Sequence, residues 1–223
     1  MVQIIVLAAV AFFLFWRLKT VLGSRQGFEN TKNDVNKVKN PTKARKKSNE
    51  NDNIIELEPN RIDEDIADYV EENSAQFKTL SEMKKIEDGW QVSQFVSGAK
   101  LAYEEILMAF ENGDLEKIKK LSSNEVYSIF KEVIDERNKK GLTVEAVFDG
   151  VRDIRIKDVK LNKRTLNAEI TMIFKCDLTY TIKDKNNKLI EGGPDKIKKQ
   201  KDIWTFSRKM KSETPNWFLV KTE

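Results

Sequence analysis

The spacing of the apolar residues changes near Gly141, and this change constrains the fold more than any other feature of the sequence. Between residues 92 and 140 the apolar positions recur about every three to four residues, which is the period of an amphipathic helix. After Gly141 apolar and polar residues alternate, which is the period of a half-buried strand. Helices followed by strands predict an α+β domain with helices packed on one face of a sheet.

Three helices are expected before that change. The first covers residues 92–111 and ends at Asn112-Gly113, because glycine readily takes the left-handed conformation that closes a helix. A short helix follows Asp114. Ser122 and Glu125 have the spacing of a capping box, which predicts the start of the third helix. The core-facing residues expected on the first helix are Phe95, Ala99, Ala102, Tyr103, Ile106 and Phe110.

The strands after Gly141 are expected to form one antiparallel sheet. Residues 184–188 and 192–194 have the composition of turns. Residues 203–208 and 217–220 are the last two predicted strands. In the earlier strands the alternation is carried by Ile154, Ile156, Leu166, Ala168, Ile170, Met172, Cys176, Leu178, Tyr180 and Ile182.

The first 22 residues form an apolar run that predicts a transmembrane helix. From residue 2 to residue 16 the only polar side chain is Gln3. Extension to residue 22 gives a helix of about 31 Å, close to the hydrocarbon thickness of a bilayer. A buried core helix is the alternative, but nothing near the run covers a surface that is apolar all round. The expected anchor residues are Ile4, Ile5, Val6, Leu7, Phe12, Phe13, Leu14, Phe15, Trp16, Arg17 and Lys19.

The charges beside the predicted anchor indicate its orientation. All the nearby basic residues follow the run, so the positive-inside rule leaves the N-terminus outside and the rest of the chain in the cytoplasm. In a bacterium this membrane is the inner, or cytoplasmic, membrane. Cleavage as a signal peptide is not expected, because the run begins uncharged and ends in large aromatic residues.

Residues 23–53 are expected to form a basic, disordered linker, because they contain too few apolar side chains to support a core. From Arg17 to Asn53 there are ten Lys or Arg residues against four acids. One cluster in this linker suits anionic lipid headgroups. A tether that is merely solvated is an equal alternative. The cluster consists of Lys43, Arg45, Lys46 and Lys47.

Residues 54–88 form an acidic segment with eleven acids against four basic residues. Its apolar residues recur at helical spacing, which predicts that the segment is partly helical. It has three possible destinations: the C-terminal domain, a partner, or neither, with docking favoured. Direct membrane binding is disfavoured, because helices that lie on membranes usually carry Lys and Arg on the polar face. The apolar positions are Ile62, Ile66, Tyr69, Val70, Phe77 and Leu80.

The composition argues against catalysis. The chain has no histidine, which removes the commonest general base and the commonest metal ligand. Cys176 is the only cysteine, so no disulfide can form within the chain, and a buried apolar role is expected for it. Asp149 precedes Gly150, and an ordinary turn residue is favoured there over a catalytic carboxylate. No catalytic residue, metal site or cofactor is therefore predicted.

Several short motifs follow one another from Gly89 to the C-terminus. In their order and spacing they resemble the C-terminal domain of the translocase subunit forty-four family, the mitochondrial import-motor adaptors and their bacterial relatives. The apolar run followed by Arg17-Leu18 and Val21-Leu22-Gly23 also resembles the bacterial members, whereas the linker departs from the family. The motifs are Phe95-Val96-Ser97-Gly98-Ala99-Lys100, Ala102-Tyr103-Glu104, Ala109-Phe110, Gly113-Asp114, Leu121-Ser122, Glu125-Val126-Tyr127, Trp204-Thr205-Phe206 and Pro215-Asn216-Trp217.

The resemblance implies that residues 89–223 form a cystatin-like cone of the nuclear-transport-factor-two type, with helices packed on a curved antiparallel sheet around an apolar pocket. For Gly98 and Ala99 a close approach of helix to sheet is favoured over ligand contact. For the aromatic residues a place in the core or pocket wall is favoured over recognition. The candidate pocket or binding residues are Phe95, Gly98, Ala99, Tyr103, Trp204, Phe206 and Trp217.

The resemblance also implies a function. Mitochondrial adaptors of this family tether a seventy-kilodalton heat-shock chaperone to the translocation channel and contact acidic lipids, and related domains anchor ribosomes. We therefore expect a membrane-anchored adaptor that binds proteins at the inner membrane during translocation, insertion or complex assembly. Its partner would be a translocase, a chaperone or a ribosome. The alternatives are a carrier of lipid or another apolar ligand, a ribosome tether and, as a distant third, an enzyme.

A run of lysines at residues 196–201 has two explanations. It suits contact with nucleic acid or a ribosome, or it is a solvated hairpin edge that lysines keep from pairing with other strands. The second explanation is favoured, and no specific nucleic acid is expected as a partner.

Overall fold

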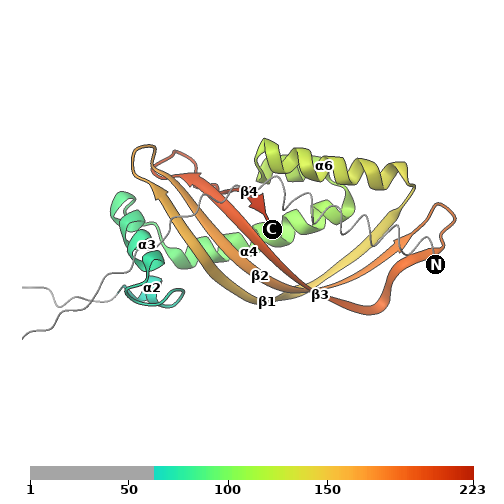
Figure 1. Cartoon of the computed structure of the whole chain (residues 1–223), viewed down its shortest axis with the longest axis horizontal. Helices are drawn as coiled ribbons and strands as arrows, with labels where there is room; N and C mark the ends of the chain where they lie inside the picture. The colour runs from blue at the N-terminus through green and yellow to red at the C-terminus, as the bar shows by residue number, and fades with distance from the viewer. Residues whose placement is uncertain (1–62) are drawn as a thin grey trace, which may run out of the picture. The chain divides into compact units, whose positions relative to one another are not determined.

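The computed structural model describes residues 63–223, and in this part of the chain five helices precede four strands (Figure 1). The predicted α+β fold with an antiparallel sheet is confirmed. The helices are α2 (Glu64–Ala67), α3 (Ala75–Ile86), α4 (Val92–Asn112), α5 (Leu115–Leu121) and α6 (Asn124–Lys139). The strands are β1 (Thr143–Asn162), β2 (Asn167–Lys183), β3 (Leu189–Lys209) and β4 (Phe218–Thr222).

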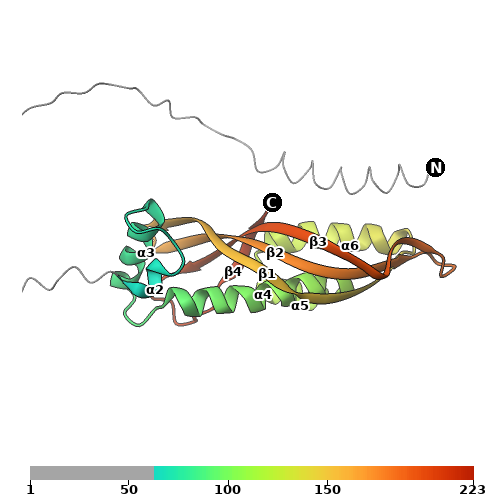
Figure 2. The ribbon, with the colours of Figure 1, turned by 90° about the horizontal axis from the view of Figure 1, so that it is seen from below.

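The sheet is a simple meander in the order β1-β2-β3-β4, and every pair is antiparallel. Asn162 pairs with Asn167 across the first turn and Lys183 pairs with Leu189 across the second, so each connection joins neighbouring strands. Figures 1 and 2 show the three long strands curving along α4. β2 and β3 are each one continuous strand and are longer than the strands that the alternating pattern predicted.

Three bulges interrupt β1 and account for part of this curvature. The register with β2 shifts between Phe148 and Gly150, between Val151 and Asp153 and between Ile156 and Asp158. Each shift leaves an extra residue on β1, which bends the strand and increases its twist. The first extra residue is Asp149. The prediction that Asp149 lies in a turn is therefore wrong, because the strand continues through it.

The predicted turn at residues 192–194 is also wrong. Gly192 pairs with Thr181, and pairing with β2 resumes at Ile197 opposite Thr179, so the intervening residues form a bulge within β3. A side chain at Gly192 has no room, because a Cβ atom there would lie 2.0 Å from the carbonyl oxygen of Tyr180. The glycines thus allow a local bend, and the chain does not reverse. The turn predicted at residues 184–188 is confirmed, with Asp184 N–H donating to the Lys188 carbonyl at 3.0 Å.

Helix ends follow the sequence closely, with one exception. Gly113 closes α4 in the left-handed conformation, as predicted. α6 begins one residue later than predicted, because Ser123 is the cap and its hydroxyl accepts a hydrogen bond from Val126 N–H at 3.3 Å. Ser122 instead bridges to Leu219 of β4, and its hydroxyl donates to the Ile118 carbonyl at 2.7 Å. The predicted capping box of Ser122 with Glu125 is therefore wrong.

The main core lies between α4 and the sheet. Alternate residues of β2 point into it, and the residues that face outward are only half-buried, as expected for a sheet covered on one face. A second, smaller cluster joins the end of α4 to α5 and α6 and contains Ala109, Ile118 and Ile134. The fully buried large side chains of the main core include Tyr103, Ile106, Ile170, Met172, Phe174 and Phe206.

The described part of the acidic segment packs on this domain. Ile66 of α2 and Leu80 and Met83 of α3 are fully buried in the main core. α3 lies against β1, and the side-chain amide of Gln76 donates to the Lys157 carbonyl at 3.2 Å. For residues 63–86, docking on the C-terminal domain is thus the alternative that the structure supports.

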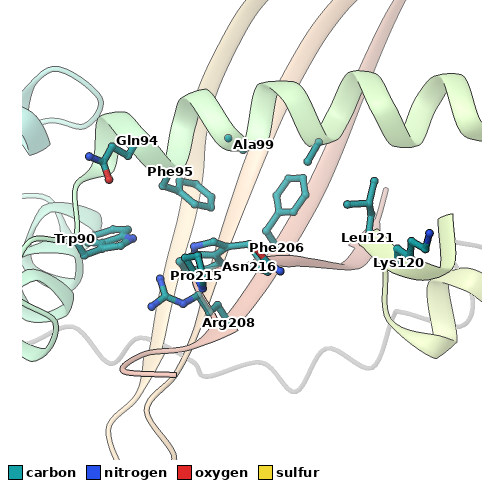
Figure 3. Close-up of a pocket in the computed structure, with 13 residues that line it drawn as sticks. Trp90, Gln94, Phe95, Ala99, Lys120, Leu121, Phe206, Arg208, Pro215 and Asn216 are labelled. Atoms are coloured by element: carbon teal, nitrogen blue, oxygen red, sulfur yellow. The ribbon is translucent and has the colours of Figure 1, made fainter. Parts of the chain in front are cut away.

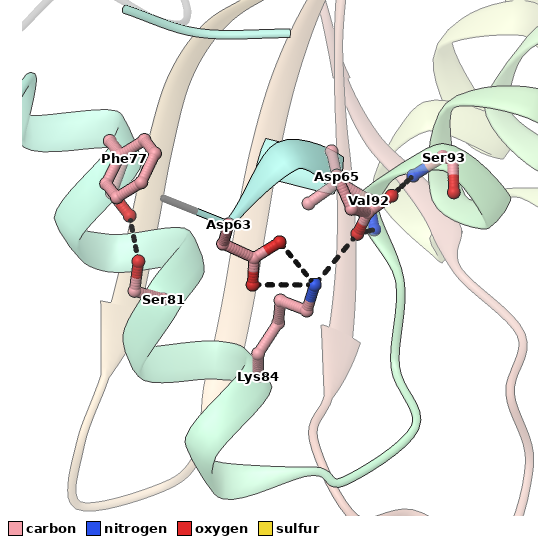
Figure 4. A network of polar contacts seen from close by, with 7 residues as sticks. All are labelled: Asp63, Asp65, Phe77, Ser81, Lys84, Val92 and Ser93. Atoms are coloured by element: carbon pink, nitrogen blue, oxygen red, sulfur yellow. Dashed lines mark hydrogen bonds and ion pairs between the residues drawn. The ribbon is translucent and has the colours of Figure 1, made fainter. Parts of the chain in front are cut away.

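A polar network joins α2 and α3 to the start of α4 (Figure 4). The carboxylate of Asp65 accepts hydrogen bonds from the N–H groups of Val92 at 2.8 Å and Ser93 at 2.9 Å. Lys84 lies 2.8 Å from Asp63 and 3.1 Å from Asp65. The N-cap residue of α4, Gln91, makes no side-chain cap, so Asp65 supplies from another helix the acceptor that the first turn needs.

Candidate functional site

A cavity of about 430 Å³ opens between α4 and the C-terminal part of the sheet (Figure 3). Five segments build its wall: the link before α4, one side of α4, the end of α5, the last part of β3 and the connection that leads into β4. Their lining residues are Trp90, Gln94, Phe95, Gly98, Ala99, Ala102, Lys120, Leu121, Phe206, Arg208, Pro215, Asn216 and Trp217.

Aromatic rings form the wall at the start of α4. Phe95 packs edge-on against Trp217 with ring centroids 4.7 Å apart, and against Phe206 at 6.4 Å. Trp90, which comes just before α4, lies 6.4 Å from Trp217. These tilted arrangements are the ones that aromatic quadrupoles favour. They hold a rigid apolar surface against which an apolar group can pack.

Small residues on α4 leave space on the other side of the cavity. A Cβ atom added to Gly98 would meet no atom within 4 Å, so this glycine faces open space. The expectation that Gly98 allows a close approach of helix to sheet is therefore wrong. Ala99 is buried, and with Ala102 it continues the strip of small side chains one turn further along the helix.

Arg208 places a cation in the wall of the cavity, but contacts within the protein already neutralise its charge. Its side chain is only 5% exposed, and the guanidinium lies 2.5 Å from the carboxylate of Glu87. It also lies 6.0 Å from the ring centre of Trp217. Glu87 accepts a further hydrogen bond from Lys211 N–H at 2.6 Å. This pair connects the link before α4 to the end of β3, so Arg208 lines the cavity as a structural element.

The ionisation of Glu87 follows from this pairing. Partial burial alone would raise the pKa of Glu87, but the hydrogen bonds from Arg208 and the Lys211 N–H outweigh it and lower the pKa below its usual range. The carboxylate therefore stays charged at neutral pH and neutralises Arg208. Lys120, at the end of α5, is an exposed lining residue and leaves a cation at the mouth of the cavity.

The structure brings together five of the seven predicted pocket residues, namely Phe95, Gly98, Ala99, Phe206 and Trp217. Tyr103 and Trp204 do not line this cavity. Both lie in the core, where Tyr103 stacks on Phe174 at 4.2 Å and lies 4.6 Å from Trp204. For these two residues the favoured explanation, a place in the core, agrees with the structure, while ligand binding by the other five stays a prediction.

The hydroxyl of Tyr103 belongs to a small hydrogen-bonded group of polar side chains. It donates to the carboxylate of Asp202 at 2.5 Å and lies 3.1 Å from Cys176 Sγ. Burial and the neighbouring Asp202 charge raise the pKa of Tyr103, so its hydroxyl stays protonated and acts as a donor. Cys176 is fully buried, as predicted. Gln200 completes the group by donating to Asp202 at 2.7 Å.

The remaining site predictions concern charge, metal and membrane. Within residues 63–223 no group of three or more Cys, Asp or Glu side chains has the arrangement of a metal site. Asp149 is exposed, and its carboxylate accepts a hydrogen bond from the Thr179 hydroxyl at 2.9 Å. The predicted anchor residues and the cluster Lys43, Arg45, Lys46 and Lys47 lie outside the described residues. None of the helices in the described part is long and apolar enough to cross a bilayer.

Sequence reasoning missed several lining residues. Trp90 follows Gly89 directly before the predicted helix, and a tryptophan at that place is a usable signal for an aromatic wall. Pro215 and Asn216 belong to a motif that indicates the family but carries no signal of its own for a cavity. Gln94, Lys120 and Arg208 gave no signal, because only the folded chain brings residues from α4, α5 and β3 to one cavity.

Comparisons with known proteins give one informative match. The model of a family described as "Tim44-like domain" matches residues 76–223. Among solved structures, the intermembrane space region of the chloroplast protein ARC6 is similar, with a TM-score of 0.40 and 9% identity over 57% of this chain and 94% of that chain. A search among curated proteins finds no match.

Proposed function

Because the chain belongs to the Tim44-like domain family, we propose that it is a membrane-anchored adaptor that binds proteins at the inner membrane during translocation, insertion or complex assembly. Family membership supports the coarser statement, a membrane-associated adaptor in protein translocation. The finer statements rest on the apolar run at residues 1–22 and on the orientation of charge beside it. The C-terminal domain would then lie in the cytoplasm, held at the membrane surface.

One structural observation carries the binding part of this proposal. The family domain keeps an open cavity of about 430 Å³ with aromatic rings on one wall and small residues on the other. A cavity of this size takes a bulky apolar side chain or an acyl chain, and pockets of this kind are the usual binding sites of a domain. The curved sheet with α4 along it also supports the cone of the cystatin-like or nuclear-transport-factor-two type.

The proposal includes no catalysis. The sequence contains no histidine, and the buried polar group of Tyr103, Cys176 and Asp202 is internally hydrogen-bonded. Binding is therefore the chemistry that we assign to this domain.

In-cell crosslinking with mass spectrometry tests the adaptor. The full-length protein is compared, in its own membrane, with a variant that lacks residues 1–22. We expect crosslinks to a translocase, chaperone or ribosomal subunit that depend on those residues. Crosslinks that are the same in both proteins would contradict the anchored adaptor.

A matched pair of substitutions tests the cavity. Gly98→Leu places a side chain in the open space, while Ser97→Leu adds the same side chain at the neighbouring exposed position of α4 that does not line the cavity. If the cavity binds the partner, Gly98→Leu reduces the crosslinks at least tenfold and Ser97→Leu leaves them unchanged. Equal yields from both variants would separate partner binding from the cavity.

A carrier of lipid or another apolar ligand is the second candidate. The apolar walls and the exposed Lys120 at the mouth suit an amphipathic anion. This candidate predicts that lipid co-purifies with the full-length protein and is detected by mass spectrometry, and that Gly98→Leu removes it. Absence of bound lipid from the unsubstituted protein would exclude the carrier.

A further inference from the structure

The two edges of the sheet differ in how well they are protected against pairing with another strand. β1, at one edge, is interrupted by three bulges, and α3 packs against it. Both features discourage a further strand, because a bulge bends the edge and a helix covers it. β3 forms the other edge wherever β4 does not pair with it. Its register with β2 is unbroken from Ile197 to Lys209, so this edge has no bulge over that length.

Part of β3 has a neighbouring strand on one side only. β4 and the residue after it pair with β3 as far as Ile203, which exchanges two backbone hydrogen bonds with Glu223, at 3.2 and 2.8 Å. In Figure 1 β4 is a short arrow, while β3 continues beside β2 to the far end of the sheet. Among the described residues, no strand pairs with this side of β3 between Ile197 and Asp202. We call residues 197–202 the open edge.

The backbone groups of the open edge are oriented for pairing. The N–H and C=O groups of Ile203 point away from β2, toward Glu223. Alternate residues of a strand point the same way, so the N–H and C=O groups of Ile197, Lys199 and Lys201 also point away from β2. The groups of the residues between them point to β2. The open edge therefore presents alternate donors and acceptors at the spacing of an antiparallel ladder.

The side chains beside these backbone groups lie on the outer face of the sheet. Gln200 pairs with Cys176, which is fully buried in the core, so the residues on either side of Gln200 face outward. Ile197 is 63% exposed, and Lys199 and Lys201 are also exposed. A strand that paired with the open edge would place its own side chains directly opposite one aliphatic side chain and two lysines.

The acids around the open edge do not cancel its charge. Asp177, on the outer face of β2, lies 2.8 Å from Arg152 Nε. Asp202 accepts two side-chain hydrogen bonds, at 2.5 and 2.7 Å. Asp149 lies two strands away on β1, where it accepts a hydrogen bond from a threonine of β2. Asp195 is exposed and lies in the bulge before the open edge.

Four lysines and no acid occupy residues 196–201. Lysines at an edge keep two copies of the same strand from pairing, because their charges repel. The same charges favour a strand that carries carboxylates at the opposing positions, so they select a partner while they exclude others. Nucleic acid would contact the lysines, but it has no peptide N–H and C=O groups that could continue the ladder.

We propose that the open edge is a docking site for an extended acidic segment of a partner protein, which adds to β3 as a strand in line with β4. In antiparallel pairing the first, third and fifth residues of the segment lie opposite Lys201, Lys199 and Ile197. The segment therefore carries acids at the first and third positions and an aliphatic residue at the fifth. Backbone pairing supplies the affinity, and the opposing side chains supply the specificity. This inference rests on the proposed function and names the class of partner.

Hydrogen exchange of the full-length protein in detergent micelles, read at single residues, tests the docking site. The probe is a capped peptide with the core Glu-Thr-Glu-Thr-Val. The matched control peptide carries N-methyl groups on both glutamates, which keeps the charge but removes the two donors that face β3. At saturation the probe should slow exchange of the Lys199 and Lys201 amides at least tenfold. The amides of Lys198 and Gln200, which point to β2, should be unchanged, and the control peptide should slow none of the four.

Reversal of charge gives a second test. Lys199→Glu together with Lys201→Glu should weaken binding of the acidic probe about tenfold, because each pair of opposite charges across a ladder contributes a few-fold in affinity. The same variant should bind a peptide with the core Lys-Thr-Lys-Thr-Val, which the unsubstituted protein should not bind. Glutamate at both Lys100 and Lys117, exposed residues of α4 and α5, should leave binding of both peptides unchanged.

Three results would overturn the inference. The first is equal protection by the probe and the N-methylated peptide, or protection by neither. The second is protection of the open edge by single-stranded RNA and not by the probe. The third is protection of α4 alone, which would place the peptide in the cavity. Each result leaves the proposed adaptor standing, because crosslinks that depend on residues 1–22 decide that function separately.

Discussion

The two ends of the sheet are made of the same three long strands, yet they differ in what covers them. At one end β2 presents Ala168, Ile170, Met172 and Phe174 to the core, and all four are fully buried. At the other end β1 exposes Val147, and β3 exposes Leu189 and Ile197. The alternation of apolar and polar residues continues through both ends, so periodicity does not explain the difference. The helices explain it, because α4 packs on the inner face of the sheet, whereas Val147, Leu189 and Ile197 lie on the outer face, away from α4.

The buried contacts that stabilise the domain and its exposed apolar side chains lie at different ends of the sheet. The covered end contains the main core, the cavity and the contacts of α2 and α3. The uncovered end contains bulges, lysines and exposed aliphatic side chains. Substitutions at the covered end should therefore lower the stability of the domain, while substitutions of the exposed side chains at the other end should leave stability nearly unchanged.

Truncation of a large side chain in the main core should lower stability the most. Phe174 is fully buried and stacks on Tyr103 at 4.2 Å, so Phe174→Ala should lower the free energy of unfolding by about 3–5 kcal/mol. Ile197→Ala at the uncovered end should change it by less than about 0.5 kcal/mol. Urea denaturation followed by tryptophan fluorescence measures both. Similar losses from both variants would remove the distinction between the two ends.

One glycine at the uncovered end should be an exception, because its substitution is expected to lower stability. Gly192 has a φ of +80°, and a Cβ atom there would lie 2.0 Å from a backbone oxygen, so Gly192→Ala should destabilise the β3 bulge by about 2 kcal/mol or more. We expect faster amide hydrogen exchange in β2 and β3 near Thr181 and little change in α4. Loss of protection throughout the domain would mean that the uncovered end and the core unfold together.

Acid should weaken the covered end through Asp65. Partial burial alone would raise the pKa of Asp65, but hydrogen bonds from Ser93, Val92 N–H and Lys84 outweigh it and lower the pKa from 3.8 to about 2. A lowered pKa means that its contribution is complete above about pH 4 and is lost as the pH falls toward 2. We expect about 1 kcal/mol after allowance for screening by solvent.

The variant Asp65→Ala checks this assignment. It should be less stable than the unsubstituted protein at neutral pH by about 1–2 kcal/mol, because the first turn of α4 loses its acceptor. The difference between the two proteins should shrink as the pH falls from 4 to 2. A difference that stays constant over that range in urea titrations would contradict the role of the Asp65 charge.

The smallest expected effect has the opposite sign. Gly98 lies inside α4 with no atom within 4 Å of an added Cβ, so Gly98→Ala should raise the free energy of unfolding by about 0.5–1 kcal/mol. The two alanine variants can be compared directly, because an added Cβ atom has space at Gly98 and has none at Gly192. A destabilised Gly98→Ala variant in the same urea titration would show that the helix needs glycine there for a reason other than space.

The elements with local signals could be predicted from the amino-acid pattern. Helical spacing from residue 92 and Gly113 predicted α4 and its end, and alternation after Gly141 predicted an antiparallel sheet. Five of the seven predicted pocket residues line the cavity, because the family motifs around Phe95 and Trp217 include its aromatic wall. These features depend on residues a few positions apart, whose spacing can be read directly along the chain.

Contacts between residues far apart in the chain depend on the complete fold. Asp65 caps a helix 27 residues away, and Glu87 pairs with Arg208 across 121 residues. The bulge at Gly192 and the shifted cap at Ser123 depend on pairing with β2 and β4, which no local pattern specifies. The sheet register likewise places Val147, Leu189 and Ile197 on one uncovered face. Periodicity describes which face of an element is apolar, but packing between elements decides which apolar faces are buried and which remain for a partner.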